Sequence, residues 1–291
     1  MQVQKSYKET AYGNLYLVPT PIGNLGDTSQ RILDTLNEVD LIASEDTRNT
    51  QKLLNHFGIQ KAQKSLHEHN FKERIPQLLE LLKSGQSIAQ VSDAGMPSIS
   101  DPGHELVLAC IEENIHVIAL PGPTAGLTAL IASGLTPQPH YFYGFLPRKK
   151  KEQLTTLATL QQLSATMIFY ESPYRLKATL ANFVEVFGAD RQVVVCRELT
   201  KIHEEYLRGS LQEVLTYCSE NEIKGECCLL LAGASTNIQT LEIAQLTDEQ
   251  LIQMIDTLIA KGDKPNAAIK EVAKQVGIKK QELYQLYHRE K

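Results

Sequence analysis

The stretch VSDAGMPSISDPG, residues Val91–Gly103, decides the fold that this sequence predicts. The apolar run before it, SIAQV (Ser87–Val91), is typical of a buried strand, and HELVLACIEE after it predicts a helix. Asp101 as N-cap and Pro102 at the first helical position would start that helix. A loop at the carboxyl end of a parallel strand is where an open α/β sheet usually holds a ligand. A connection that only has good turn chemistry is the alternative interpretation.

Two further loops have the same arrangement. The strand NLYLVPT (Asn14–Thr20) enters PTPIGNLGDTS, and HVIALPG (His116–Gly122) enters PTAGLTALIASG, whose small residues let a helix and a ligand approach closely. The first loop lacks the signatures of a phosphate loop and of a dinucleotide fingerprint. With LIASED (Leu41–Asp46) as another strand, strand and helix alternate about five times over residues 1–136. This alternation predicts an N-terminal α/β domain whose parallel sheet is covered on both faces.

Residues 137–236 predict a second α/β domain, and Leu135–His140, with two prolines, marks the boundary. Its predicted strands include Gly225–Gly233, which is apolar on both faces. Charged residues crowd the ends of two other predicted strands, in Thr166–Arg175 and Arg191–Lys201: Glu171, Arg175, Arg197, Glu198 and Lys201. These side chains suggest a cleft that is lined by charged groups. The alternative is that they form ion pairs without a catalytic purpose.

Basic residues gather in two places. The run Arg148–Lys151 follows three aromatic residues and lies at a predicted helix start, where cations are disfavoured. An anionic partner would explain the run, and a solvated helix start is the alternative.

After a predicted linker at residues 234–241, residues 242–291 predict helices with the helix, glycine turn and helix of a helix-turn-helix unit. From Lys261 onward this segment has eight Lys or Arg and four acidic residues, which favours a phosphate-facing role over protein packing.

Composition narrows the class of protein further. The net charge of -5 argues against bulk attraction to nucleic acid, and no run approaches the roughly 18 apolar residues that span a bilayer. The five cysteines lack a CxxC pair and lie mainly in apolar runs, so we expect buried, reduced thiols. Two histidines in SLHEHN (Ser65–Asn70) would share one face of a strand, but a third ligand is missing, so no metal is expected. The N-terminus lacks a signal-type apolar segment, and a cytoplasmic protein is expected.

Seven motifs together resemble a known family. The sequence is similar to the tetrapyrrole-methylase-type (class III) S-adenosylmethionine methyltransferases, and within them to the branch that methylates 16S ribosomal RNA. The resemblance covers roughly Asn14 to Gly233, and the helical tail matches the helix-turn-helix domain often appended to that branch. The motifs occur in this order: VPTPIGNLGD, ASEDTR, SDAGMPSISDPG, PGPTA, GFLPRK, FYESPYR and CRELTK.

The resemblance implies two α/β/α domains of the tetrapyrrole-methylase type and a small C-terminal all-α helix-turn-helix domain, usually in a homodimer. It implies S-adenosyl-L-methionine in the cleft between the α/β domains. It further implies methyl transfer to the ribose 2'-oxygen of a cytidine in the decoding region of 16S ribosomal RNA, within the 30S subunit. Carried over to this sequence, the implied cofactor residues are Pro21, Ile22, Asp93, Ala94, Gly95, Ser98, Thr124, Ala125, Tyr170, Leu199 and Gly225.

One motif departs from the wider family. Where porphyrin-modifying members have a glycine-rich GGDP-like loop, this chain reads SDAGMP, which argues against a tetrapyrrole substrate and leaves the cofactor contacts near Asp93–Met96 open. The rival functions are a small-molecule, tetrapyrrole-type methyltransferase and a non-enzymatic RNA-binding assembly factor. The small-molecule rival leaves the basic run and the tail unexplained.

A ribose hydroxyl is a poor nucleophile at neutral pH, so a nearby base or a cation that stabilises the alkoxide would help. Glu171 with Arg175 is the first choice, because both flank the predicted cleft, and Asp46 with Arg48 is the alternative that the sequence leaves open. The further candidates are Glu45 and Asp101 as base, and Arg197 and Lys201 as cation. Contacts to the RNA backbone would come from Arg148, Lys149, Lys150 and Lys151, with Tyr141, Phe142 or Tyr143 free to stack on an unpaired base.

Overall fold

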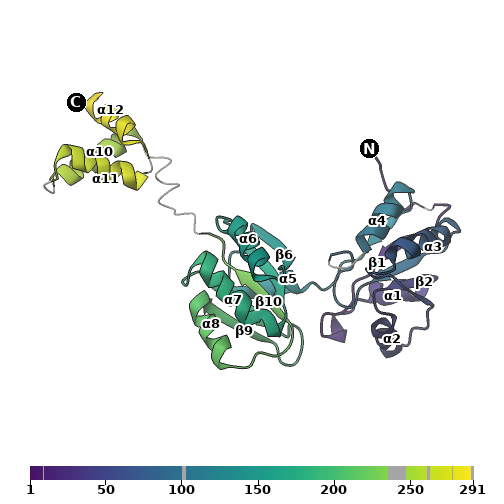
Figure 1. Ribbon diagram of the computed structural model, residues 1–291. Coiled ribbons are helices and arrows are strands. Elements are labelled where there is room, and N and C mark those ends of the chain that lie inside the picture. The colour runs from purple at the N-terminus through teal and green to yellow at the C-terminus, as the bar shows by residue number, and fades with distance from the viewer. Residues whose placement is uncertain (9, 100–102, 235–246, 261–262, 277, 290–291) are drawn as a thin grey trace. The chain divides into compact units, whose positions relative to one another are not determined.

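The computed structural model describes residues 1–8, 10–99, 103–234, 247–260, 263–276 and 278–289. The chain forms two compact units, Met1–Ala232 and Gly233–Lys291, and the first unit contains two β-sheets (Figure 1). The predicted helix start at Asp101 and Pro102, and residues 235–241 of the predicted linker, lie outside the described residues.

The first sheet has five strands that are all parallel. Their order is β3-β2-β4-β1-β5, so the chain crosses over between neighbours as a parallel sheet requires. The strands are β1 (Leu15–Leu17), β2 (Leu41–Ser44), β3 (Gln63–Ser65), β4 (Ile88–Val91) and β5 (Val117–Ala119). All residues of β2 and β4 are buried, because helices cover both faces of the sheet. The predicted parallel sheet is confirmed.

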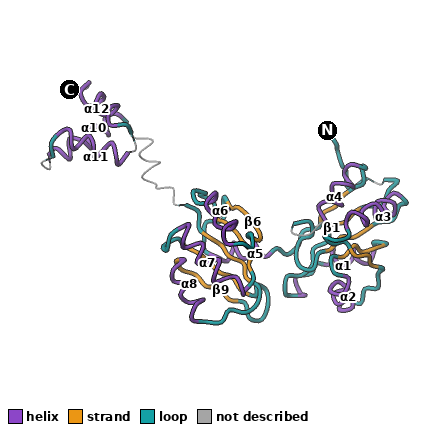
Figure 2. The backbone as a smooth tube through the Cα atoms, in the orientation of Figure 1, coloured by secondary structure: helices purple, strands orange, loops and turns teal. Residues whose placement is uncertain are grey.

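Helices form a layer on each face of this sheet (Figure 2). Apolar residues of α1 (Gln30–Glu38) and α2 (Thr47–His56) pack on one face, and those of α3 (Phe71–Lys83) and α4 (Gly103–Glu112) pack on the other. The Ser29 side chain caps α1, and Asp46 caps α2. A short 3-10 helix, η1 (Leu25–Asp27), lies in the loop after β1.

One prediction in this part is wrong. His67 and His69 were expected on one face of a strand, but β3 already ends at Ser65, and both histidines lie in the turn before α3. The side chain of Asn70 closes that turn, because its Oδ1 accepts a hydrogen bond from the His67 backbone at 2.9 Å and its Nδ2 donates to the Ser65 carbonyl at 3.2 Å. Asn competes with strand geometry by such local bonds.

The second sheet is mixed. Its order is β6-β7-β10-β8-β9, in which β6 and β7 are parallel and the remaining neighbours are antiparallel. The strands are β6 (His140–Phe145), β7 (Thr166–Glu171), β8 (Gln192–Arg197), β9 (Glu205–Ser210) and β10 (Cys227–Leu231). Because β10 runs against both of its neighbours, its first residue, Cys227, pairs with the last residues of β7 and β8, Glu171 and Arg197.

Helices again cover both faces of the second sheet. The core on one face is filled by α6 (Lys150–Leu160), α7 (Pro173–Phe187) and α8 (Leu211–Glu220). The other face is covered by α5 (Ala125–Ser133), which Figure 1 shows beside β6 and β10. This helix follows β5 of the first sheet in sequence. The predicted domain boundary at residues 136–137 therefore lies after a helix that already packs on the second sheet.

The C-terminal unit is a three-helix arrangement around its own core. It consists of α10 (Asp248–Ala260), α11 (Pro265–Val276) and α12 (Lys280–Arg289). Ile255, Ile269 and Leu283 are fully or almost fully buried, one from each helix. The Tyr287 hydroxyl donates to Asp256 Oδ1 at 2.6 Å and so ties α12 to α10. The predicted α/β fold class is confirmed, since each of the two sheets is covered by helices on both faces and an all-α unit follows them.

The buried thiols are also confirmed, since all five cysteines are free and buried. In the described parts of the chain, no helix combines the length and the apolar character that crossing a membrane requires.

We expect Phe183→Ala to destabilise the first unit strongly. Phe183 is 0% exposed in the core of the second sheet, and its ring lies 5.1 Å from that of Phe169 and 5.6 Å from that of Phe187. Truncation leaves a cavity, so the free energy of unfolding should fall by about 3–5 kcal/mol in a urea titration followed by circular dichroism. The control is Tyr217→Ala on the surface of α8, and an equal loss in both variants would contradict this packing.

Candidate active site

A cavity of about 490 Å³ lies where the loops of the first sheet meet the strand ends of the second sheet, within the first unit. This volume is in the range of pockets that bind drug-sized cofactors. The first sheet contributes the loops after β1, β2, β4 and β5, represented by Ile22, Glu45, Ala94 and Thr124. The second sheet contributes residues of β6, β7, β8 and β10 and of the loops beside them.

Seven of the residues predicted to bind the cofactor line this cavity: Ile22, Ala94, Gly95, Thr124, Ala125, Tyr170 and Leu199. Two others, Pro21 and Asp93, line a second cavity of about 400 Å³, and Ser92 lines both cavities. Ser98 lies between two lining residues of the first cavity and accepts a hydrogen bond from Gln90 Nε2 at 3.0 Å. Gly225 directly precedes the lining residue Glu226.

Backbone contacts join the loops around the cavity. Thr20 and Gly95 exchange two backbone hydrogen bonds of 3.0 Å, which tie the β1 loop to the β4 loop. Gly95 has a φ of 78°, and a Cβ there would lie 3.3 Å from the side chain of Ile22. Glycine is therefore suited to this position by its conformation and by the narrow space. The Tyr170 hydroxyl accepts a hydrogen bond from the Gly126 backbone at 3.1 Å and so joins the start of α5 to β7.

The lining of the first cavity is acidic. It includes the carboxylates of Glu45, Glu171 and Glu226, and its described residues include no Lys, Arg or His. Such a lining attracts a cationic ligand and repels an anionic one. S-adenosylmethionine is positive at sulfur and at its amino group, so the residues present fit the cofactor that the sequence predicts. Phe145 and Tyr170 add aromatic surface for an adenine ring.

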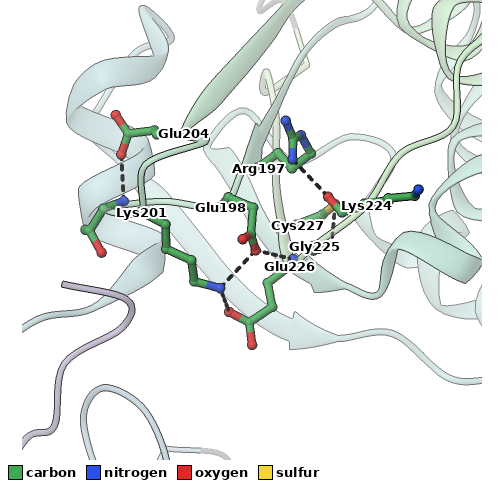
Figure 3. Close-up of polar contacts among 9 residues, drawn as sticks. Arg197, Glu198, Lys201, Glu204, Lys224, Gly225, Glu226 and Cys227 are labelled. Carbon is green, nitrogen blue, oxygen red and sulfur yellow. Dashed lines mark hydrogen bonds and ion pairs between the residues drawn. The ribbon is translucent and has the colours of Figure 1, made fainter.

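The turn after β8 holds one wall of the cavity (Figure 3). Lys201 Nζ lies 2.9 Å from Glu198 Oε1 and 3.0 Å from Glu226 Oε2, and Glu198 Oε1 also accepts from the Glu226 backbone at 2.9 Å. The hydrogen bond from Lys201 lowers the pKa of Glu198. Lys201, predicted as a catalytic cation, is thus bound by two carboxylates.

Backbone strain in the same turn directs Leu199 into the cavity. Glu198 and Thr200, on either side of it, have φ values of 52° and 66°, which are uncommon for residues other than glycine. The β1 loop packs on this turn, since a Cβ at Gly23 would lie 2.9 Å from Thr200 Oγ1 and 3.0 Å from the Leu199 carbonyl. The strained turn therefore supports both the cavity wall and the loop of the first sheet.

Of the two candidate pairs, Glu171 with Arg175 is the one whose carboxylate lines the first cavity. Glu171 lines it, and its side chain is only 2% exposed. Arg175 Nη2 lies 3.4 Å from Glu171 Oε2 and donates to the carbonyl of Pro147 at 2.9 Å. The guanidinium compensates the buried carboxylate and also fixes the segment that follows Phe145.

Asp46 and Arg48 lie in a more open place. The Arg48 side chain is 86% exposed, and its Nη2 lies 2.7 Å from Asp46 Oδ2. Hydrogen bonds from the Arg48 side chain and backbone lower the pKa of Asp46 to about 2. A carboxylate with so low a pKa is a weak base at neutral pH. Asp93, which lines the second cavity, accepts hydrogen bonds from the Asp46 backbone and from Asn49 Nδ2, so the pair borders that cavity.

The basic run Arg148–Lys151 is exposed at the start of α6. Lys149 forms an ion pair with Glu152 at 3.1 Å, and Lys150 forms one with Glu185 at 3.2 Å. The run begins three positions after Phe145, which lines the first cavity. The exposed cations therefore follow a residue of the cavity wall closely in the sequence.

Sequence reasoning missed the thiols of the cavity wall. Cys196, Cys227 and Cys228 line it, and burial raises the pKa of Cys196 and Cys227 to about 12. They are protonated at neutral pH and act as small apolar groups. In a parallel sheet the site lies at the ends of strands, whereas β10 begins at the cavity because it is antiparallel to its neighbours. The missed residues that also line it are Ser92, Met96, Ile99, Phe145, Ser172, Pro173 and Glu226.

The chain has the fold of the tetrapyrrole methylases. Residues 14–215 match the family of tetrapyrrole (corrin/porphyrin) methylases. Among solved structures, the uroporphyrin-III C-methyltransferase from Thermus thermophilus complexed with S-adenosyl homocysteine has a TM-score of 0.54 at 15% identity, covering 76% of this chain and 97% of that one. A diphthine synthase has a TM-score of 0.58 at 14% identity, covering 76% of this chain and 90% of that one.

Curated relatives match over nearly the whole length. The ribosomal RNA small subunit methyltransferase I of Streptococcus pyogenes serotype M3 is 56% identical, covering 99% of both chains. The protein of the same name from Halalkalibacterium halodurans is 48% identical, covering 100% of both chains. The one from Bacillus subtilis is 47% identical, covering 95% of this chain and 94% of the relative. The chain belongs to the tetrapyrrole methylase family and, within it, to the group of ribosomal RNA small subunit methyltransferase I. The predicted cofactor, S-adenosyl-L-methionine, is confirmed at the level of the family.

We expect Gly225→Ala to weaken binding of S-adenosylhomocysteine. Gly225 has a φ of 84°, and a Cβ there would overlap the carboxyl group of Glu198, which must then leave Lys201 and Glu226. Gly188→Ala is the matched control, because Gly188 has a φ of 88° and a Cβ there would meet nothing within 4 Å.

Both variants should lose about 1–2 kcal/mol of unfolding free energy from left-handed strain. Only Gly225→Ala should lower the affinity measured by calorimetry. Equal affinities in the two variants would show that the contact with Glu198 does not support the cavity.

Proposed function

We propose that this protein methylates the ribose 2'-oxygen of a cytidine in the decoding region of 16S ribosomal RNA, with S-adenosyl-L-methionine as donor. The similarity over the full chain to proteins named ribosomal RNA small subunit methyltransferase I supports ribosomal RNA as substrate. The nucleotide and the 2'-oxygen rest on the family resemblance of the sequence. We further propose that it acts in the cytoplasm, on the 30S subunit, as a homodimer for which the exposed Leu127 and Ile131 of α5 offer an apolar surface.

The acidic cavity is the observation that most directly supports S-adenosyl-L-methionine as the donor. The bound cofactor supplies an electrophilic methyl group on a sulfonium sulfur. The protein's task is then to position the acceptor hydroxyl in line with that group and to exclude water. Loops from two sheets form the walls, and Glu45, Glu171 and Glu226 face a cationic ligand with three carboxylates. The thiols and aromatic rings of the second sheet form the apolar part of the wall.

The second cavity provides a place for the target nucleotide. It adjoins the first at Ser92 and is lined by polar side chains that include Asn49, Lys52 and Asp93. Thr50 also lines it and is 4% exposed, and its hydroxyl has no hydrogen-bond partner among the described residues. Buried hydroxyls are rarely left unpaired, so a ligand group would satisfy it. Amide, carboxylate and hydroxyl groups together suit the edges of a nucleobase.

Two pairs remain candidates for activating the ribose hydroxyl. We propose Glu171 with Arg175 first, because the carboxylate lines the cofactor cavity. Asp46 with Arg48 is the alternative, and it lies beside the second cavity but has a carboxylate of low basicity. Lys201 would act through the cavity wall that it helps to hold.

RNA binding would use exposed cations near the cavity and in the tail. Arg148, Lys149, Lys150 and Lys151 are exposed at α6, and Tyr141 and Phe142 of the edge strand β6 are exposed as well. In the C-terminal unit, the exposed Tyr284 packs against His288 on α12, with a ring distance of 4.3 Å. Cations with aromatic rings are typical of surfaces that bind unpaired RNA.

The test of the proposed reaction is mass mapping of 16S ribosomal RNA from cells with and without this protein. We expect one cytidine of the decoding region to lose a methyl group in cells that lack the protein. The purified protein should restore it on 30S subunits when S-adenosylmethionine is present. Unchanged RNA in both strains would contradict the proposed substrate, and binding without methylation would favour the assembly-factor alternative.

The basic run gives a separate expectation. Lys151→Gln should weaken RNA binding about equally for all sequences and reduce the slope of log affinity against log salt by about 1, because one phosphate contact is lost. Lys72→Gln, an exposed lysine at the start of α3, is the control. Filter binding of a 16S fragment at several salt concentrations measures both slopes. Identical slopes would place the RNA elsewhere.

A further inference from the structure

Four polar side chains are buried where α6 and α7 pack below the end of β7. Gln153 comes from α6, Thr179 and Asn182 come from α7, and Glu171 is the last residue of β7. Their exposed fractions are 4%, 1%, 6% and 4%. They lie beside the apolar core formed by these helices, where buried polar groups are costly unless they are hydrogen-bonded. We refer to these four residues as the buried polar chain.

The hydrogen bonds run in one continuous path. Asn182 Nδ2 donates to Gln153 Oε1, and Gln153 Nε2 donates to Thr179 Oγ1 at 3.3 Å. The Thr179 hydroxyl donates in turn to Glu171 Oε2 at 2.7 Å. The path therefore begins between two helices and ends on a carboxylate that lines the cofactor cavity.

The carboxylate of Glu171 is held at both oxygens. Oε1 accepts from the Ser172 backbone at 2.9 Å, and Oε2 receives the Thr179 hydroxyl and lies 3.4 Å from Arg175. A free hydroxyl can rotate. Here Gln153 Nε2 donates to Thr179 Oγ1, so the Thr179 hydroxyl proton points toward Glu171. Asn182 orients the Gln153 amide in the same way. Each member thus fixes the donor direction of the next.

We propose that Thr179, Gln153 and Asn182 are positioning residues that hold the Glu171 carboxylate in the orientation that the bound cofactor requires. This inference rests on the proposed function only in that the cavity binds S-adenosylmethionine. Thr179, Gln153 and Asn182 act on Glu171 through hydrogen bonds, and none of the three is among the described residues that line the cavity. The buried polar chain also ties α6, which begins within the basic run, to α7, because Gln153 of α6 bonds to Thr179 and Asn182 of α7.

The decisive variants are Thr179→Val and Thr179→Ser. Valine keeps the shape of the side chain but removes the donor to Glu171, whereas serine keeps the donor. We expect Thr179→Val to bind S-adenosylhomocysteine about tenfold more weakly, as lost orientation of one charged contact implies, and Thr179→Ser to restore binding. Thr35→Val is the matched control, since Thr35 is a buried helical threonine whose hydroxyl donates to the Arg31 carbonyl within α1.

Calorimetry with S-adenosylhomocysteine and thermal unfolding separate positioning from stability. A structural role would lower the melting temperature of Thr179→Val and Thr35→Val alike and leave the affinity of the folded protein unchanged, and that result would overturn the proposal. The double variant Gln153→Leu with Asn182→Leu replaces both partners, so neither is left unpaired. Its affinity should lie between those of the wild type and Thr179→Val, and wild-type affinity would remove Gln153 and Asn182 from the positioning role.

The assay contains no RNA, so it is independent of the proposed substrate. A wild-type protein that binds S-adenosylhomocysteine but leaves 16S RNA unmodified would contradict the proposed function and leave this test intact. A wild-type protein that does not bind it would contradict the cofactor assignment of the cavity, and with it this inference.

Discussion

The antiparallel insertion of β10 between β7 and β8 is the constraint on which the site depends. It places Cys227 against Glu171 and Arg197, so two strand ends and one strand start share an edge of the second sheet. The turn after β8 and the residues before β10 are then close enough for Glu198, Lys201 and Glu226 to form one ion cluster. Because of this pairing, the loops of the first sheet pack against an ordered wall of the second sheet.

Much of the first half could be predicted because a single periodic pattern determines it. Short apolar runs separated by helices require a parallel sheet with loops at its carboxyl edge, and Ile22, Ala94, Gly95 and Thr124 all come from those loops. The second half was harder, because strand direction leaves no mark in the composition of a fully buried strand. Cys227 and Cys228 could therefore be recognised as core residues but not as the wall of a cavity.

The charged candidates show a second limit of the sequence. Glu171, Asp46 and Lys201 all lie at or shortly after the end of a strand, so position favours Glu171 but does not exclude the other two. Their partners distinguish them: Arg48 makes Asp46 weakly basic, two glutamates hold Lys201, and a threonine eight residues away orients Glu171. Some of these pairs are local, as Asp46 with Arg48, but Glu226 and Thr179 lie outside the motifs CRELTK and FYESPYR and reach Lys201 and Glu171 only in the folded protein.

The acidic lining of the first cavity has a consequence for competition among metabolites. Adenosine triphosphate presents the same purine and ribose as the sulfonium cofactor, and cells contain it in abundance. Its phosphates would meet the carboxylates of Glu45, Glu171 and Glu226; Arg175 and Lys201 pair with two of them, but the described lining itself has no lysine or arginine to bind a phosphate. Like-charge repulsion of this kind excludes a ligand that shape alone would admit. The cavity can thus remain available to a scarcer molecule that has a positive charge where the nucleotide has a negative one.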